Sequence, residues 1–373
     1  MNDATNTVLR KLLKRPSAVV ALCIIGLTCV VSVFAYLLAA DATPSANRMI
    51  IELGAKHPGF KKQLLYIPKS SKQEHGSRFF EWFNGAPSDY QALPINSYNF
   101  IGDRIIVRHY IDDSIEDTLS YALKSLLPQE YSAAPLSEQQ AYLGQHQIIT
   151  RTFYLGTDRY GRDILSRLLI GSRVTLAVGL IAVLLSLTIG IILGSLAGYY
   201  GGVVDNVVMW IINILYAIPT LLLVFAITLT IGKGFWEIFI AIGLSMWVGA
   251  ARLIRGQVLA LREMEYVTAA KALGLGDMRI IFRHILPNIA GPLMVIAASN
   301  FAAAILVEAG LSFLGFGVQP PHPSWGLMIK EHYNFLLTNR PLLALIPGIA
   351  IMLLVYAFNI LGNALRDVLD VRG

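Results

Sequence analysis

The sequence predicts an all-α membrane protein: six transmembrane helices, with a mixed extracytoplasmic insertion after the first helix. Two observations indicate this fold class. Of the 373 residues, 55% are hydrophobic and only 14% are charged, whereas soluble proteins carry about a quarter charged residues. The hydrophobic residues also form long runs, and about 20 apolar residues in a helix cross the ~30 Å hydrocarbon core of a bilayer. A helix is expected there because it satisfies its own backbone hydrogen bonds.

Six segments have the length of a membrane-spanning helix. The fourth is the least regular, because Glu237 stands at its start. The predicted segments are 17–40, 174–197, 207–231, 236–254, 289–311 and 341–361.

The first segment is predicted to be a retained membrane anchor. A basic flank precedes it, as in a signal peptide, but its apolar run exceeds the 7–15 residues of a signal sequence. Its two cysteines, Cys23 and Cys29, are the only ones in the chain. We predict that both fill buried apolar space and form neither a disulfide nor a metal site.

The chain divides into a cytoplasmic N-terminus with its anchor (1–40), an extracytoplasmic segment (41–170) and a five-helix core (171–373). Lysine and arginine concentrate on the cytoplasmic side of membrane proteins, and five of them lie in the loop 255–288. This loop and both termini are therefore predicted to be cytoplasmic. Five arginines between 151 and 173 would lie outside, at the end of a long translocated region where the charge rule loses force.

The extracytoplasmic segment is predicted to be partly folded. The run 105–107 is strand-like. Residues 114–127 are predicted to form an amphipathic helix, with Ser114 as N-cap and apolar residues on one face: Ile115, Leu119, Leu123 and Leu126. The four histidines of this segment lack ligand spacing, so no metal site is expected. We expect the segment to pack over the outer mouth of the protein, or to be an insertion that stabilises only this chain.

Glycine recurs every four residues at the end of the second predicted helix. Small residues let two membrane helices approach closely, so a packed face is favoured over a merely flexible helix end. The glycines are Gly190, Gly194, Gly198 and Gly202. Pro219, Pro287 and Pro292 are expected to interrupt helical hydrogen bonding.

Few polar residues lie within the predicted spans. Asn300 and Glu308 are candidates for the pathway or for helix packing, because a carboxylate inside a bundle commonly marks a pathway or a partner. The alternative for Glu308 is that it reaches the outer membrane interface. Both interpretations stay open from sequence.

Several functional classes lack support. The phosphate-loop pattern Gly-x-x-x-x-Gly-Lys-Ser/Thr is absent, so ATP-driven transport would need an ATPase on another chain. No aromatic-basic platform or zinc finger indicates nucleic-acid binding, and no catalytic constellation lies within the helices.

The most informative segment is polar and helix-forming, and lies between two long apolar segments. It runs from Glu265 to Gly274 and is followed by Arg283-His-Ile-Leu-Pro287. A short helix before Gly274 and another after Asp277 would form a compact knob, with Gly274 supplying a turn of positive φ. Its apolar residues would be Val267, Ala270 and Leu273. We interpret this knob as a docking surface for another protein.

This segment resembles the "EAA" signature of binding-protein-dependent ABC importer permeases. The matching residues are Ala269, Ala270, Gly274, Leu286 and Pro287. The sequence departs from the signature at Thr268, where a glutamate is usual, and at His284, where an isoleucine is usual.

Three further stretches are similar to the "C"-type subunits of dipeptide and oligopeptide permeases, and the resemblance covers 155–372 and the anchor. They are Leu155-Gly-Thr-Asp-Arg-Tyr-Gly-Arg-Asp163 with Ser166-Arg167 and Gly171; Glu308-Ala-Gly-Leu-Ser-Phe-Leu-Gly-Phe-Gly-Val-Gln-Pro-Pro321 with Pro323-Ser-Trp-Gly326; and Arg366-Asp-Val-Leu-Asp-Val-Arg372. Residues 41–150 have no counterpart in this family.

The resemblance implies a subunit of the bacterial cytoplasmic (inner) membrane. It would pair with a homologous permease and two ATPase subunits, which bind the ATP, while this chain binds no cofactor. An extracytoplasmic binding protein would deliver the substrate. The loop that couples to the ATPase would contain Glu265, Ala269, Ala270, Gly274, Asp277, Leu286 and Pro287.

Peptides are the leading substrate class that the resemblance implies, with nickel chelates or peptide-like antibiotics as the alternative. A channel or secondary transporter that works without ATP is a rival hypothesis, and a membrane-embedded enzyme is another. Uptake that persists without ATP would identify the first rival.

Overall fold

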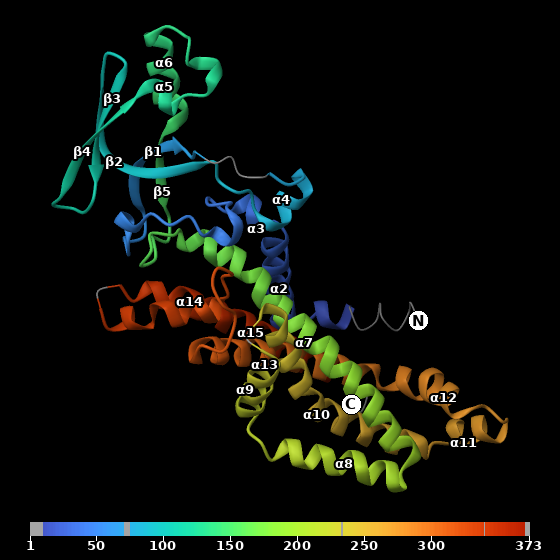
Figure 1. Cartoon of the computed structure of the whole chain (residues 1–373). Helices are drawn as coiled ribbons and strands as arrows, with labels where there is room; N and C mark the ends of the chain where they lie inside the picture. The colour runs from blue at the N-terminus through green and yellow to red at the C-terminus, as the bar shows by residue number, and fades with distance from the viewer. Residues whose placement is uncertain (1–9, 71–74, 233, 339, 370–373) are drawn as a thin grey trace. The chain divides into compact units, whose positions relative to one another are not determined.

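The structure is a computed structural model that describes residues 10–70, 75–232, 234–338 and 340–369 (Figure 1). It forms two compact units. The helical unit comprises the described parts of Met1–Val33, Ser172–Glu331 and Leu345–Gly373, and the sheet unit comprises those of Phe34–Gly171 and His332–Ala344.

Five described helices are long and apolar enough to cross a membrane. They coincide with five of the six predicted segments, because each contains an uninterrupted apolar run. They are α2 (Pro16–Val33), α7 (Ile164–Tyr200), α10 (Phe235–Arg262), α13 (Ala290–Leu314) and α15 (Leu342–Leu369).

The predicted span 207–231 is broken at Pro219, where an interruption is expected from the sequence. This stretch forms α8 (Gly202–Tyr216) and α9 (Thr220–Ile231), which are bent by 96° relative to one another. Pro219 causes the break, because it lacks a backbone N–H and keeps the preceding residue out of the helical region. The described part of the chain therefore has five spans, or six if the bent pair counts as one.

The core of the helical unit lies between α7, α9, α10 and α13. Val178 and Ala182 of α7 are buried there together with Phe239 and Ile242 of α10. Ala304 on α13 is fully buried in the same cluster. Small and branched side chains alternate across these helices, as close packing requires. The other helices of this region are α11 (Glu265–Ala272), α12 (Asp277–Ile280), η5 (Ile281–Ile285), η6 (Leu286–Ile289) and α14 (Trp325–His332).

The sheet unit is a five-stranded antiparallel sheet of order β4-β3-β2-β1-β5. Its strands are β1 (Phe60–Pro68), β2 (Tyr90–Ile101), β3 (Arg104–Tyr110), β4 (Glu116–Ala122) and β5 (Ile148–Phe153). Leu65, Ile95 and Ile105 form its core with Leu126 and Leu143. The remaining elements are α3 (Ala35–Leu38), η1 (Pro44–Ala46), η2 (Ile51–Leu53), α4 (Arg78–Asn84), α5 (Leu123–Leu126), η3 (Gln129–Tyr131), α6 (Leu136–Tyr142), η4 (Leu143–Gln147) and η7 (Tyr333–Leu337).

The predicted strand at 105–107 is confirmed as part of β3, but the predicted helix at 114–127 is wrong. Half of that stretch is β4, where Leu119 lies opposite Val107 and Tyr121 opposite Ile105, and only Leu123–Leu126 is helical. Alternate side chains of β4 thereby join the buried cluster of the sheet. Ser114 is not an N-cap, because its backbone N–H donates to Asp112 Oδ1 in the turn before β4 (2.7 Å). Cross-strand pairing outweighs the weak helical periodicity.

The prediction that Cys23 and Cys29 are buried is also wrong. Both are exposed in this chain, because α2 buries little of its surface, chiefly Ala18 and Ala21.

Candidate functional site

The knob predicted from sequence is present at one end of the helical unit. Figure 1 shows α11 and α12 as two short helices that follow α10. Gly274 joins them with φ of +74°, and the N–H of Leu275 donates to the carbonyl of Ala270 (3.2 Å). A Cβ at Gly274 would meet nothing within 4 Å, so the left-handed backbone alone requires glycine there.

One side of the knob is locked to the long helices. Val267 and Ala270 of α11 are buried, as is Ile280 of α12, in a cluster with Ile254 and Val258 of α10. Burial of this kind contributes about 25 cal/mol per Å² of apolar surface. The inner face of the knob and α10 therefore move together.

Hydrogen bonds and an ion pair also attach the knob and the neighbouring helices to one another. Asp277, at the start of α12, accepts a hydrogen bond from the hydroxyl of Tyr199 on α7 (2.8 Å). Arg262 Nη1 donates to the carbonyl of Tyr199 (3.1 Å). Arg255 forms a two-pronged ion pair with Asp205 of α8. Four elements (α7, α8, α10 and α12) are tied together at this end.

The other side of the knob is exposed. Glu265 and Ala269 are both on this side. Leu273, the third apolar residue named for the knob, is 81% exposed. It follows the last turn of α11 on the side away from α10, and Met278 and Phe282 are also exposed nearby in sequence. The described chain thus presents an apolar outer face that it does not itself cover.

The second half of the signature bends the chain into α13. Residues 281–285 form one π-helical turn, and Leu286–Ile289 a 3-10 turn. Pro287 explains the change, since a proline cannot donate and clashes with the carbonyl four residues earlier in a regular helix. Leu286 is half-buried in the knob's cluster, whereas Pro287 is exposed. Residues 255–262 of the predicted loop are helical and belong to α10.

The glycine stripe is a close helix contact, as predicted, at three of its four positions. A Cβ at Gly190 would lie 2.7 Å from Ala250 Cβ; one at Gly194 would lie 2.6 Å from the Ala251 carbonyl oxygen. A Cβ at Gly198 would lie 2.8 Å from the Arg255 carbonyl oxygen. Gly202 is not part of the contact, because the helix has ended and a Cβ there would meet nothing within 4 Å.

Asn300 and Glu308 lie on α13, apart from the knob. Asn300 donates to Ser186 on α7 (Nδ2 to Oγ, 3.3 Å). Glu308 is fully buried and accepts from Ser312 (2.6 Å), with Ser324 as a second hydrogen-bonding hydroxyl. Glu308 thus has hydrogen-bonding partners inside the chain and links the end of α13 to the start of α14.

The helical unit contains a cavity of about 640 Å³ between α10, α13 and α15. Gln257, Ser299 and Arg366 give it polar groups, each from a different helix. Sequence reasoning missed Gln257 and Ser299, because only the packing of the helices brings them together. Arg366 opens the last family-like stretch, and residues 370–372 of that stretch lie outside the described residues. Asn300 and Glu308 do not line this cavity.

Sequence reasoning also missed the ionic role of the stretch 155–163. Arg162 and Arg167 are almost fully buried and face Asp158, with Nε to Oδ2 distances of 2.5 Å and 3.9 Å. A Cβ at Gly161 would lie 1.7 Å from the Ile50 carbonyl oxygen. This stretch therefore holds residues near 50 against the start of α7, which is a structural role in the sheet unit.

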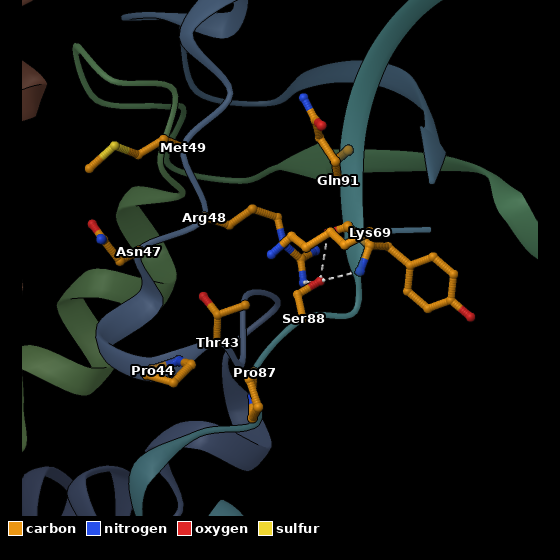
Figure 2. Close-up of a pocket in the computed structure, with 11 residues that line it drawn as sticks. Thr43, Pro44, Asn47, Arg48, Met49, Lys69, Pro87, Ser88 and Gln91 are labelled. Carbon is orange, nitrogen blue, oxygen red and sulfur yellow. Dashed lines mark hydrogen bonds between the residues drawn. The ribbon is translucent and has the colours of Figure 1, made fainter. Parts of the chain in front are cut away.

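A second cavity, of about 360 Å³, lies within the sheet unit. Figure 2 shows Arg48 beside Ser88 in this pocket; Arg48 Nη2 and the Ser88 oxygen are 3.5 Å apart. Asp41 lies 3.7 Å from Arg48 Nε and offsets part of its charge. Lys69 also lines the pocket.

Comparisons with known proteins agree with the resemblance. The profile of the family described as "Binding-protein-dependent transport system inner membrane component" matches residues 190–372. A glutathione transport system permease protein of Pectobacterium atrosepticum is 42% identical over 217 residues, which are 58% of this chain and 72% of that protein. A dipeptide transport system permease protein of Bacillus subtilis is 42% identical over 217 residues (58% and 68%). An oligopeptide transport system permease protein of Bacillus subtilis is 40% identical over 221 residues (59% and 72%).

Proposed function

This chain belongs to the family of binding-protein-dependent inner-membrane permeases of ABC importers, and from this premise we propose that it forms the translocation path for di- or oligopeptides. Relatives named for glutathione, dipeptides and oligopeptides support a peptide-type substrate. The polar cavity between α10, α13 and α15 supports a path along these helices.

The proposal includes partners. A homologous permease pairs with this chain, two ATPase subunits bind and hydrolyse ATP, and an extracytoplasmic binding protein delivers the peptide. Both termini and the knob lie in the cytoplasm. The absence of a phosphate loop from the sequence supports separate ATPase subunits.

The two-sided construction of the knob carries the proposal. Its inner face is buried against α10 and hydrogen-bonded to α7, while its outer face, including Ala269 and Leu273, is exposed. A partner that holds the outer face would transmit its motion to α7 and α10. Coupling of this kind needs contacts that differ between two states, and the knob can supply them as a rigid body.

Substitutions at two neighbouring alanines distinguish a loss of ATPase docking from a loss of folding. Ala269→Arg changes the exposed face, and we expect the ATPase subunits that copurify to fall at least tenfold, with the thermal stability of the chain unchanged. Ala270→Leu adds bulk to the buried face and should lower thermal stability as well. Ala269→Ser is the matched control and should keep the subunits. Full recovery of ATPase subunits with Ala269→Arg would overturn the assignment of the outer face.

Transport in proteoliposomes tests the substrate. The complete transporter with its binding protein should accumulate labelled di- or oligopeptides only when ATP is hydrolysed. Uptake restricted to nickel chelates would overturn the peptide assignment. Peptide uptake without ATP would indicate a channel or a secondary transporter, and ATP hydrolysis by this chain alone would contradict the separate ATPase subunits.

A further inference from the structure

The sheet unit carries an unusual aromatic helix. Four of the seven residues of α4 are aromatic: Phe79, Phe80, Trp82 and Phe83. Phe79 is 69% exposed, Phe80 58% and Phe83 42%. At 100° per residue these four side chains cover about 160° of the helix surface, and Arg78, Glu81 and Asn84 occupy the rest. Leaving this much aromatic surface in water is unfavourable by about 25 cal/mol per Å².

The polar side of α4 is held by the rest of the sheet unit. His75 contacts Glu81 through Nδ1 (2.9 Å) and Asp89 through Nε2 (2.7 Å). Ser77 caps the helix by accepting from the N–H of Phe80 (3.3 Å). These contacts fix the rotation of α4, so its aromatic side faces away from the polar contacts.

In the sheet unit, α4 contacts Phe34. The ring centroids of Trp82 and Phe34 are 6.0 Å apart, and Phe34 directly follows α2. The 18 residues of α2 rise about 27 Å at 1.5 Å per residue, close to the ~30 Å of the hydrocarbon core. Trp82 therefore contacts the residue that directly follows a helix long enough to cross the bilayer.

The surface next to Phe34 is apolar as well. In α3, Leu37 is 71% exposed and Leu38 53%, and α3 contacts α4. Trp and Tyr are enriched where a membrane protein passes from hydrocarbon to headgroups, and helices that lie in this boundary carry Trp, Phe and Leu on their apolar face. Two basic side chains of the sheet unit are also exposed: Arg78 at the start of α4, and Lys69 in the pocket of Figure 2.

We propose that α4 and the exposed side of α3 lie in the headgroup–acyl boundary of the bilayer leaflet where α2 ends. The partner of this surface is lipid, with Phe79, Phe80 and Phe83 towards the acyl chains. Continuity with a membrane span favours lipid over a protein partner, because the patch begins at the residue after that span. This contact would attach the sheet unit to the lipid surface.

Spin labels in the assembled transporter test this placement. Cys23 and Cys29 are first replaced by alanine, and single cysteines are introduced at Phe80 and Phe83. Arg78→Cys, about 160° from Phe80 around the helix, is the matched control on the polar side of α4. Leu27→Cys on α2 (66% exposed) and Ile101→Cys at the tip of β2 (62% exposed) are the lipid and water references. The frequency with which each spin label collides with oxygen, and with a water-soluble nickel complex, is measured in phosphatidylethanolamine–phosphatidylglycerol vesicles.

Labels at Phe80 and Phe83 should meet oxygen several times more often than the nickel complex, like the label at Leu27. The label at Arg78 should behave like that at Ile101. A preference for the nickel complex at Phe80 and Phe83 would place α4 in water and overturn the proposal. Low collision with both reagents would show that a protein covers α4, and would overturn it equally.

Because the cysteine variants could misfold, a second measurement leaves these phenylalanines unchanged. Brominated lipid should quench the Trp82 fluorescence, obtained as the difference between the wild-type chain and Trp82→Phe, by at least twofold. An unquenched difference spectrum would contradict lipid contact.

Discussion

The hydroxyl of Tyr199, at the end of α7, donates a hydrogen bond to Asp277 at the start of α12 (2.8 Å). The two residues are 78 positions apart in the chain. Their contact joins the glycine-lined end of α7 to the second helix of the knob, in addition to the apolar contacts of α11.

Removing this hydrogen bond should weaken the attachment of α12 to α7 without unfolding the chain. Tyr199→Phe keeps the ring and should cost about 1 kcal/mol, the usual contribution of such a bond. In the complete transporter we expect ATP hydrolysis that responds less to the binding protein, measured as the ratio of stimulated to basal rate. Tyr200→Phe, next to it in sequence, is the control. An unchanged ratio with Tyr199→Phe would show that the bond does not contribute to coupling.

The backbone at Gly274 gives a graded prediction. Its φ of +74° costs an L-residue about 1–2 kcal/mol, with asparagine tolerated best. Of the three variants, Gly274→Asn should transport best, Gly274→Ala less, and Gly274→Val least. Membrane insertion should stay normal in all three. Because a Cβ has open space there, steric clash cannot explain such an order. Equal activity of the three variants, measured as peptide uptake, would contradict the strain argument.

The seam between α7 and α10 should not tolerate even a methyl group. Gly194→Ala would place its Cβ 2.6 Å from the Ala251 carbonyl oxygen, and overpacking of this kind costs about 1–3 kcal/mol. The thermal unfolding midpoint in detergent should fall. Gly256→Ala on α10 is the control, because a Cβ there meets nothing within 4 Å, and its midpoint should stay equal or rise. Similar midpoints for both variants would disprove the close seam.

The insertion can be tested by excision at a natural junction. The N–H of Gly59 donates to the carbonyl of Phe153 (2.9 Å), so a short Gly-Ser linker can replace 60–153. We expect the segment to meet the binding protein or the paired permease at the outer mouth. Import should therefore be lost while assembly and basal ATP hydrolysis persist. Normal import that still depends on the binding protein would leave the segment only a stabilising role.

The attachment of α4 should depend on pH. Its hydrogen bond with Asp89, and then that with Glu81, raise the pKa of His75 above its ordinary value. The protonated form is thus favoured by folding, so its contribution is complete below about pH 6.5 and is lost as pH rises through the raised pKa. Amide exchange in 75–89, corrected for intrinsic rates, should be faster at pH 8.5 than at pH 6. His75→Gln should abolish that difference.

Sequence alone determined the features that depend on a continuous stretch of chain. Five spans followed from the length of their apolar runs, because a bilayer requires that length of any helix that crosses it. The knob followed from helix-forming residues on either side of Gly274, whose missing Cβ permits φ of +74°. The family resemblance rests on the same local stretches and on their order along the chain.

Only the tertiary structure decided which side of each element is covered. Val267 and Leu273 are both apolar residues of the knob, yet one is fully buried and the other 81% exposed, because α10 and α7 pack on one side alone. Leu119 suited a helix by spacing, but its partner across the sheet is Val107. Periodicity describes one segment, whereas burial and strand pairing depend on a second segment far away in the chain, and that is the information a local pattern lacks.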